Sequence, residues 1–193
     1  MRKVNLREKI VAAAVSMFAR KGFFETTVDD VARQAKIAKG TIYLYFKDKA
    51  ALYVSVIEEH MIGAIKFLEK MSREEISCSK KLLKIADQWV SYMLKFKHPF
   101  PMFTIENFNL TQKIMKSFNP ILLHNINRII GIIARIIDEG ITKGEFRRVH
   151  SQLAALHFLN VVRTEYLSQV MFSCIKNPER EIGDIFLSGL KRR

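Results

Sequence analysis

The sequence has few of the residues that interrupt helices or cross-link chains. Its 193 residues include four prolines, eight glycines and two cysteines. Cys78 and Cys174 are too few for a disulfide scaffold and fit a reducing compartment. No apolar run approaches the roughly 18 residues that cross a bilayer, and the first residues lead into an amphipathic helix rather than a signal peptide. We therefore expect a cytoplasmic protein without a membrane span.

Positive charge is in excess, and much of it lies near the N-terminus. The formal net charge is +13, and residues 1–50 contain eleven Lys or Arg against five Asp or Glu. A basic segment suits a polyanionic partner, because neutralising phosphates releases condensed counterions. Solubility alone would explain the same charge, so the inference of a nucleic-acid partner depends on the motifs that follow.

Apolar residues recur at spacings of three and four almost throughout the chain, and no segment alternates as a strand would. This periodicity predicts an all-α fold. Gly22 is expected to end the first helix, Asp48 to cap the fourth, and Asn119-Pro120 to open a helix that ends at Gly140. The expected helices span residues 6–21, 27–35, 39–45, 48–71, 80–97, 103–116, 119–140, 151–174 and 178–191.

The second and third helices form a helix-turn-helix pattern. Thr27 and Asp30 match a capping box, and a turn of three residues separates the two short helices. A helix that enters the major groove must present small and polar side chains outward. Ile37, Ile42 and Phe46 are expected to point inward. The residues expected to point outward are Lys39, Gly40, Thr41, Tyr43 and Tyr45.

Three segments in this region resemble the DNA-binding domain of TetR-family regulators, with no gap over about residues 6–55. They are Thr27-Val28-Asp29-Asp30-Val31-Ala32, Lys39-Gly40-Thr41-Ile42-Tyr43 and Phe46-Lys47-Asp48-Lys49-Ala50-Ala51-Leu52. The resemblance implies that Lys39, Gly40 and Thr41 meet bases or the nearby backbone. It implies that Thr27, Tyr43, Tyr45 and Lys49 hold phosphates.

Two residues depart from the family pattern. Lys36 stands in the turn where the family often has Gly, and Ala38 stands where Ser or Thr often caps the recognition helix. A non-Gly residue in a left-handed conformation is strained, and replacing a capping hydroxyl by Ala costs about 1 kcal/mol. The sequence therefore predicts a strained turn before a helix that lacks a side-chain cap.

The resemblance further implies a helix-turn-helix domain over residues 1–47 and a larger helical domain for effector binding and dimerisation over residues 48–193. The last two helices carry apolar stripes, which would pack either across a two-fold axis, as we expect, or into the core of one chain. Phe158, Val162, Ile182, Phe186, Gly189 and Leu190 are the expected dimer contacts. The residues expected to line an apolar pocket, or otherwise plain core, are Trp89, Tyr92, Met93, Phe96, Phe103 and Phe108.

These features predict a homodimeric repressor that binds an operator in duplex DNA and is released from it by a small apolar or aromatic ligand. An effector-free basic protein that coats DNA is the alternative. A phosphate loop, a paired-His motif and a nucleophile elbow are all missing, so we expect no enzyme and no cofactor. His98, His124, His150 and His157 lack metal-ligand spacing. A membrane-surface protein is disfavoured because the apolar stripes suit packing between helices.

Overall fold

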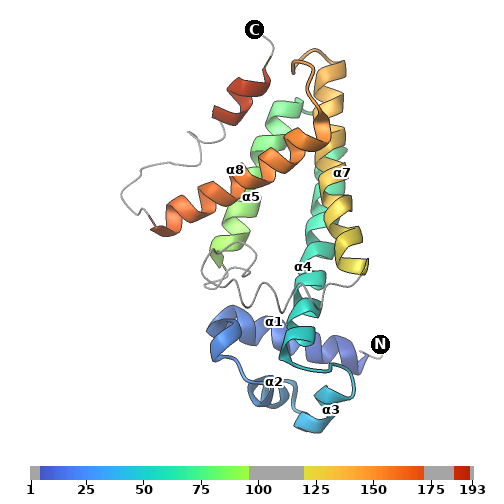
Figure 1. The fold of residues 1–193 in the computed structure, drawn as a ribbon, viewed down its shortest axis with the longest axis vertical. Helices are drawn as coiled ribbons and strands as arrows, with labels where there is room; N and C mark the ends of the chain where they lie inside the picture. Colours follow the sequence, from blue (N-terminus) through green and yellow to red (C-terminus); the bar gives the residue numbers. More distant parts are fainter. Residues whose placement is uncertain (1–4, 96–119, 172–184, 192–193) are drawn as a thin grey trace. The chain divides into compact units, whose positions relative to one another are not determined.

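The computed structural model describes residues 5–95, 120–171 and 185–191, and these residues are almost all helical. Figure 1 shows the helices in chain order. They are α1 (Leu6–Glu25), α2 (Val28–Ala35), α3 (Lys39–Tyr43), α4 (Lys49–Ser72), α5 (Cys78–Lys95), α7 (Pro120–Thr142) and α8 (Ser151–Met171), with a further short helix over residues 185–190. Among the described residues there is no strand, only one antiparallel bridge between Phe146 and Lys191. The all-α prediction is confirmed.

The expected helix ends are close to the observed ones, with four differences of two residues or more. One of them is that α5 begins at Cys78 rather than at residue 80. Helix α1 continues to Glu25, although Gly22 breaks its geometry with φ 78°. Helix α3 ends at Tyr43 rather than at residue 45, and α7 continues past Gly140 to Thr142. The expected helix over residues 103–116 lies outside the described residues.

The described residues form two compact units. The first contains α1, α2, α3 and α4 as far as Ile62, and the second contains α4 from Gly63, α5, α7 from His124, and α8. Helix α4 therefore contributes residues to both units. The predicted domain boundary between residues 47 and 48 lies in the segment just before α4 and remains a prediction.

The core of the first unit comes from apolar faces of α1, α2, α3 and α4. Helices α1 and α2 pack against each other, and α3 adds only Ile42 to the core. Arg7 of α1 connects to this packing twice, since its guanidinium donates to Ser55 Oγ at 3.2 Å and lies 5.4 Å from the centre of the Phe46 ring. The buried residues of the first unit include Ile10, Ala14, Met17, Phe18, Val31, Ala32, Ala35, Ile42, Phe46, Leu52 and Val56.

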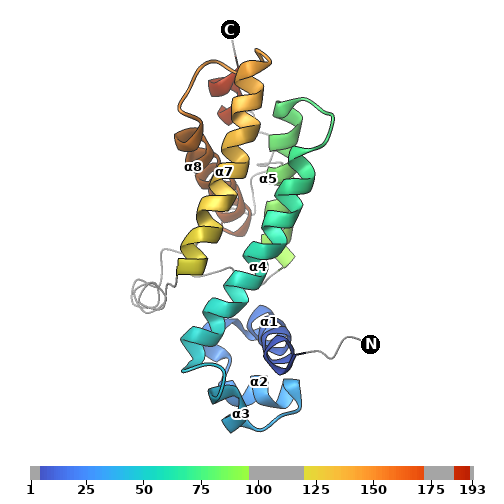
Figure 2. The ribbon, with the colours of Figure 1, turned by 90° about the vertical axis from the view of Figure 1, so that its right-hand side faces the viewer.

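The core of the second unit is built largely from isoleucine and leucine. Helices α4, α5, α7 and α8 supply it, with α5 and α8 packed against each other (Figure 2). Five isoleucines of α7 between residues 129 and 137 lie on one buried face, whereas Ile121 near the start of the helix is 58% exposed. The buried residues of the second unit include Ile65, Leu68, Leu82, Ile85, Ile129, Ile132, Ile133, Ile136, Ile137 and Ala155.

Helix α7 is also long and apolar enough to cross a membrane, with a mean hydropathy of 1.3 over its most apolar 18 residues, 44% of which are buried. It is the one such helix among the described residues. No unbroken apolar run approaches 18 residues in this helix, as the sequence analysis expected. The polar residues Asn125 and Arg128 interrupt its apolar run, which is why a search for unbroken runs missed it. A core helix passes the same test, and the buried isoleucines of α7 fit a core helix.

Gly140 is required where α7 ends, because the Phe146 ring lies where a Cβ at residue 140 would stand. Gly140→Ala is expected to destabilise the protein by about 1–3 kcal/mol through this overlap. Gly131→Ala is the matched control in the same helix, since its Cβ would meet only Arg135 Nη1 at 3.9 Å. Denaturant unfolding at one protein concentration measures both variants. Equal free energies of unfolding for Gly140→Ala and Gly131→Ala would contradict the placement of the Phe146 ring against Gly140.

Candidate nucleic-acid interface

The capping box at the start of α2 forms as the sequence predicted. The Thr27 hydroxyl accepts a hydrogen bond from the backbone N–H of Asp30 at 3.1 Å. The Asp30 carboxylate in turn accepts from the backbone N–H of Thr27 at 3.0 Å and from its hydroxyl at 2.8 Å. The backbone bond from Thr27, followed by the hydroxyl and by Lys21, holds the pKa of Asp30 well below its usual range. These bonds fix where α2 begins, and Arg33 adds an ion pair to Asp30 at 2.7 Å.

The turn after α2 contains the predicted strain. Lys36 adopts φ 53° and ψ 52°, a left-handed conformation, and its backbone N–H bonds to carbonyls of the last turn of α2. This conformation costs a non-Gly residue about 1–2 kcal/mol. The chain then enters α3 at Lys39, and Ala38 gives no side-chain cap, as expected.

Helix α3 buries one side and exposes the other. Ile42 and Phe46 are buried, and Ile37 is half-buried, so the predicted inner face is confirmed. On the outer side Lys39, Gly40, Tyr43 and Tyr45 are exposed, and Thr41 is half-buried. Leu44, which the sequence analysis did not single out, is 83% exposed. A Cβ on Gly40 would meet nothing within 4 Å, so within the chain nothing excludes a side chain there.

Lys39 has a partner that the sequence analysis missed. Its ammonium lies 2.6 Å from Asp29 Oδ2, so the pair joins the start of α3 to the first turn of α2. The hydrogen bond to Asp29 raises the pKa of Lys39. Both side chains are about half exposed, which leaves Lys39 free to exchange Asp29 for another anion at small cost.

Lys49 is turned toward the protein rather than toward solvent. Its ammonium donates to the carbonyl oxygens of Phe23 at 2.8 Å, Thr26 at 3.0 Å and Phe24 at 3.3 Å. It also lies 4.4 Å from the centre of the Phe23 ring, and burial lowers its pKa. Lys49 therefore caps the C-terminal end of α1, while its contact with phosphate stays a prediction.

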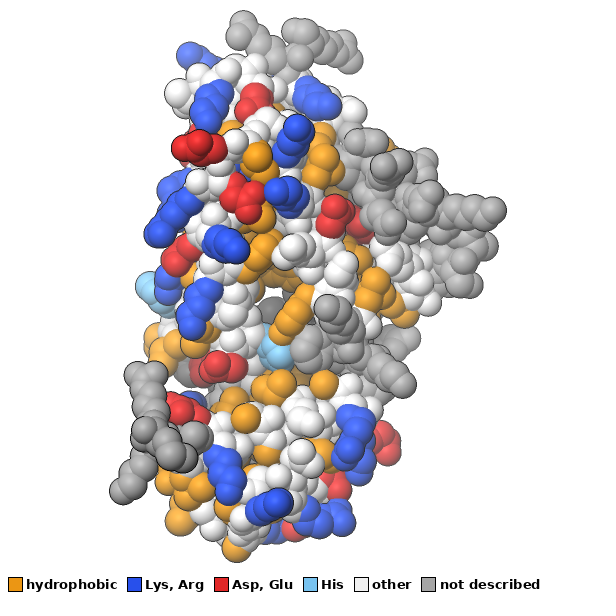
Figure 3. Space-filling model, turned by 180° about the vertical axis from the view of Figure 1, so that it is seen from behind, with side chains coloured by type: hydrophobic (Ala, Val, Ile, Leu, Met, Phe, Trp, Pro, Cys, Tyr) orange, Lys and Arg blue, Asp and Glu red, His pale blue; other side chains and the backbone are white. Residues whose placement is uncertain are grey.

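Net charge does not by itself mark the interface. On the face that Figure 3 shows, Lys and Arg side chains are interspersed with Asp and Glu. What distinguishes α3 is that its outer face exposes polar, glycine and tyrosine residues while its inner face buries Ile42. The geometry brings Lys39, Gly40, Thr41, Tyr43 and Tyr45 together on one helix and the chain directly after it, with Thr27 at the start of the neighbouring helix α2.

The predicted ligand and dimer residues lie in different surroundings. On α5, Met93 is buried, Trp89 is half-buried and Tyr92 is exposed, while Phe96, Phe103, Phe108 and Ile182 lie outside the described residues. Among the predicted dimer contacts, Phe158, Val162 and Leu190 are buried within the chain. Phe186 is half-buried with its ring centre 5.5 Å from that of Phe158, and Gly189 is exposed. The exposed apolar residues of this region are Leu153, Leu156, Val170 and Ile185.

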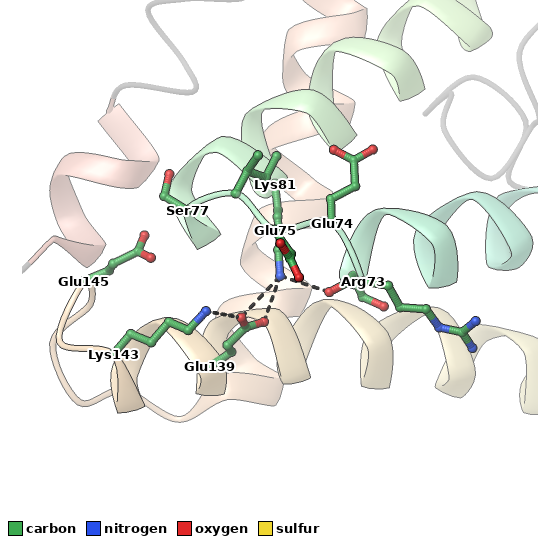
Figure 4. Close-up of a pocket in the computed structure, with 10 residues that line it drawn as sticks. Arg73, Glu74, Glu75, Ser77, Lys81, Glu139, Lys143 and Glu145 are labelled. Carbon is green, nitrogen blue, oxygen red and sulfur yellow. Dashed lines mark hydrogen bonds and ion pairs between the residues drawn. The ribbon is translucent and has the colours of Figure 1, made fainter.

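A polar pocket of about 440 Å³ lies in the second unit, where α4 ends, α5 begins and α7 ends (Figure 4). The buried ammonium of Lys81 contacts Glu139 Oε2 at 3.0 Å and donates to the Ser72 carbonyl at 2.9 Å. Lys143 pairs with the same Glu139, and the hydrogen bond from Lys143 is the main reason why the pKa of Glu139 is lowered. Glu145 accepts from the first N–H groups of α5. These charges satisfy one another, so the pocket differs from the apolar chamber that the sequence predicted.

The fold and the outer face of α3 define a helix-turn-helix DNA-binding protein. Residues 10–56 match the family model described as "Bacterial regulatory proteins, tetR family". The chain is 33% identical over 143 residues to the fatty acid metabolism regulator protein of Bacillus subtilis, covering 72% of this chain and 70% of that protein. It is 25% identical to the repressor NicS of Pseudomonas putida, covering 96% and 92%.

Among solved structures, the chain is similar to the regulator FadR of Bacillus subtilis in complex with stearoyl-CoA. The TM-score is 0.68 at 24% identity, covering 94% of this chain and 97% of that one. The chain belongs to the TetR family of transcriptional regulators.

The cap that Lys49 forms on α1 predicts a stability effect. Lys49→Met keeps the apolar stem but removes three hydrogen bonds from an ammonium, so we expect a loss of about 1 kcal/mol. Lys47→Met is the matched control, because Lys47 is exposed two residues earlier and forms no ion pair with the described residues. Thermal unfolding measures both variants. A Lys49→Met protein as stable as Lys47→Met would mean that the carbonyl contacts contribute nothing.

Proposed function

We propose that this regulator is a cytoplasmic, non-enzymatic repressor that binds an operator in duplex DNA as a homodimer, with α3 in the major groove. The observation that carries this proposal is the outer face of α3, where Lys39, Gly40, Thr41 and Tyr43 stand over the buried Ile42. Lys39, Gly40 and Thr41 would meet base edges or the nearby backbone. Thr27, Tyr43, Tyr45 and Lys49 would hold phosphates.

The capping contacts qualify two of these roles. The Thr27 hydroxyl already donates its proton to Asp30, and the Lys49 ammonium already donates to three carbonyls. A phosphate contact by either side chain would replace a bond within the protein. Tyr43 and Tyr45 are 47% and 43% exposed, and the hydroxyl of neither bonds to a described residue. They are therefore expected to contribute more of the affinity for phosphate.

Sequence preference distinguishes this proposal from a protein that coats DNA. Selection from a randomised duplex library should recover a defined site for the wild type, and Thr41→Ala should change the recovered bases at one or two positions. A lost base contact costs about 1–3 kcal/mol. Thr142→Ala, an exposed threonine at the end of α7, is the control and should recover the wild-type site. Identical sites from Thr41→Ala and Lys39→Ala would remove α3 from the recognition surface.

The homodimer is supported by apolar residues on the surface of the second unit. Leu153 and Leu156 of α8 and Ile185 of the last helix are 64%, 44% and 68% exposed. Exposed apolar residues grouped on two helices favour burial against a second copy of the chain. In this proposal Gly189 and these three residues meet the partner, while Phe158, Val162 and Leu190 support the interface from the core.

The effector is proposed to be an apolar molecule with a long acyl chain. The 33% identical relative is named for fatty acid metabolism. Trp89, which is half-buried, and Met93, which is buried, lie about one turn apart on α5, and in this proposal they contact the acyl chain. Helix α4 contributes residues to both units, so a ligand that shifts its second part would act on the segment that follows α3. Paired half-sites one helical turn apart tolerate little change in the separation of two recognition helices.

The effector proposal predicts reciprocal coupling. Trp89 is the only tryptophan, so its fluorescence should change when stearoyl-CoA or stearate is added, and benzoate serves as the small aromatic comparison. A coupling of about 1–3 kcal/mol would lower operator affinity about five- to 150-fold, and operator should weaken the same ligand by the same factor. A ligand whose affinity is the same with and without operator would contradict the mechanism.

A further inference from the structure

Lys36 is the only residue other than glycine with a positive φ among the described residues. The fold needs the left-handed conformation at this position, because the Lys36 and Ile37 N–H groups both bond to the end of α2 through it. It does not need a lysine side chain there, since glycine adopts the same conformation without strain. The conformation of the turn therefore does not explain why a lysine side chain stands at this position.

The Lys36 ammonium is also uncommitted, unlike most cations around it. Lys39 is paired with Asp29, and Lys21 and Arg33 are both paired with Asp30. Lys36 is exposed, and no ion pair or hydrogen bond joins its ammonium to any described residue. Because no carboxylate of the described chain holds it, this charge is available to an external anion without the loss of an internal contact.

We propose that Lys36 binds a backbone phosphate of duplex DNA, beside the bases that α3 reads. The inference rests on the proposed function, because it places the phosphate next to the groove that α3 enters. The turn lies three residues before Lys39, so its side chain starts near the N-terminal end of α3, which is the end that meets DNA in helix-turn-helix proteins. A lysine contributes a point charge to a phosphate and carries no sequence information.

This role predicts opposite changes in two measurements. Lys36→Gly relieves the backbone strain and should raise the Tm by about 1–3 °C. The same variant should weaken binding about five-fold at 0.15 M salt and reduce the slope of log K against log salt by about 0.9 for each subunit bound, which is about 1.8 for a dimer. A change of turn geometry alone would leave the salt slope unchanged, so the reduced slope marks the loss of a phosphate contact.

The test uses two duplexes, one selected by the wild-type protein from a randomised library and one unrelated duplex of equal length. Lys36→Gly and Lys36→Asn should weaken both by the same factor, and Lys36→Arg should keep wild-type affinity for both. Lys80→Asn, an exposed lysine of α5 without an ion pair among the described residues, controls for the loss of one charge and should leave the salt slope unchanged.

Three results would overturn the inference. They are an unchanged affinity and slope for Lys36→Gly, a loss confined to the selected duplex, and equal effects of Lys36→Asn and Lys80→Asn. The proposed function fails in a different way, when the wild type binds both duplexes equally. Since a phosphate contact also acts on the unrelated duplex, the Lys36 effect is still measured in that case.

Discussion

A helix of five residues is not stable in water by itself, because one turn of hydrogen bonds does not offset the entropy of ordering it. Helix α3 has this length, yet any reading of DNA by this chain depends on its position. Ile42 is the single buried side chain of α3. At the start of the helix Lys39 pairs with Asp29 of α2, and just after its end Phe46 is buried. The other helices of the first unit thus serve largely to position α3 with its polar face toward solvent.

Polar contacts at helix ends stabilise the first unit, in addition to its apolar core. The Thr27 and Asp30 pair fixes the start of α2, and Asp48 accepts the N–H of Ala51 at 2.8 Å at the start of α4. Lys49 then connects α4 to the end of α1. Each contact satisfies backbone groups that a helix end leaves without a partner. Short helices need such contacts most, because a larger share of their backbone lies at the ends.

Local features of the fold could be predicted from the sequence, and contacts between distant residues could not. The capping box, the break at Gly22 and the left-handed Lys36 depend on residues within a few positions of one another. The partners of Lys39 and Lys49 lie ten and about 25 positions away, and several carboxylates and carbonyls were equally possible. For α8, apolar residues occur on both sides, so periodicity did not reveal that Phe158 and Val162 face the core while Leu153 and Leu156 face outward.

The central claim is that two copies of α3 read paired half-sites in duplex DNA. Genomic fragments bound by the wild-type protein, followed by hydroxyl-radical footprinting of the strongest one, test this claim most directly. The account predicts two symmetric protected segments whose centres lie about 34 Å apart, or a multiple of one helical turn. Uniform protection along the fragment, with equal affinity for unrelated duplexes, would contradict it.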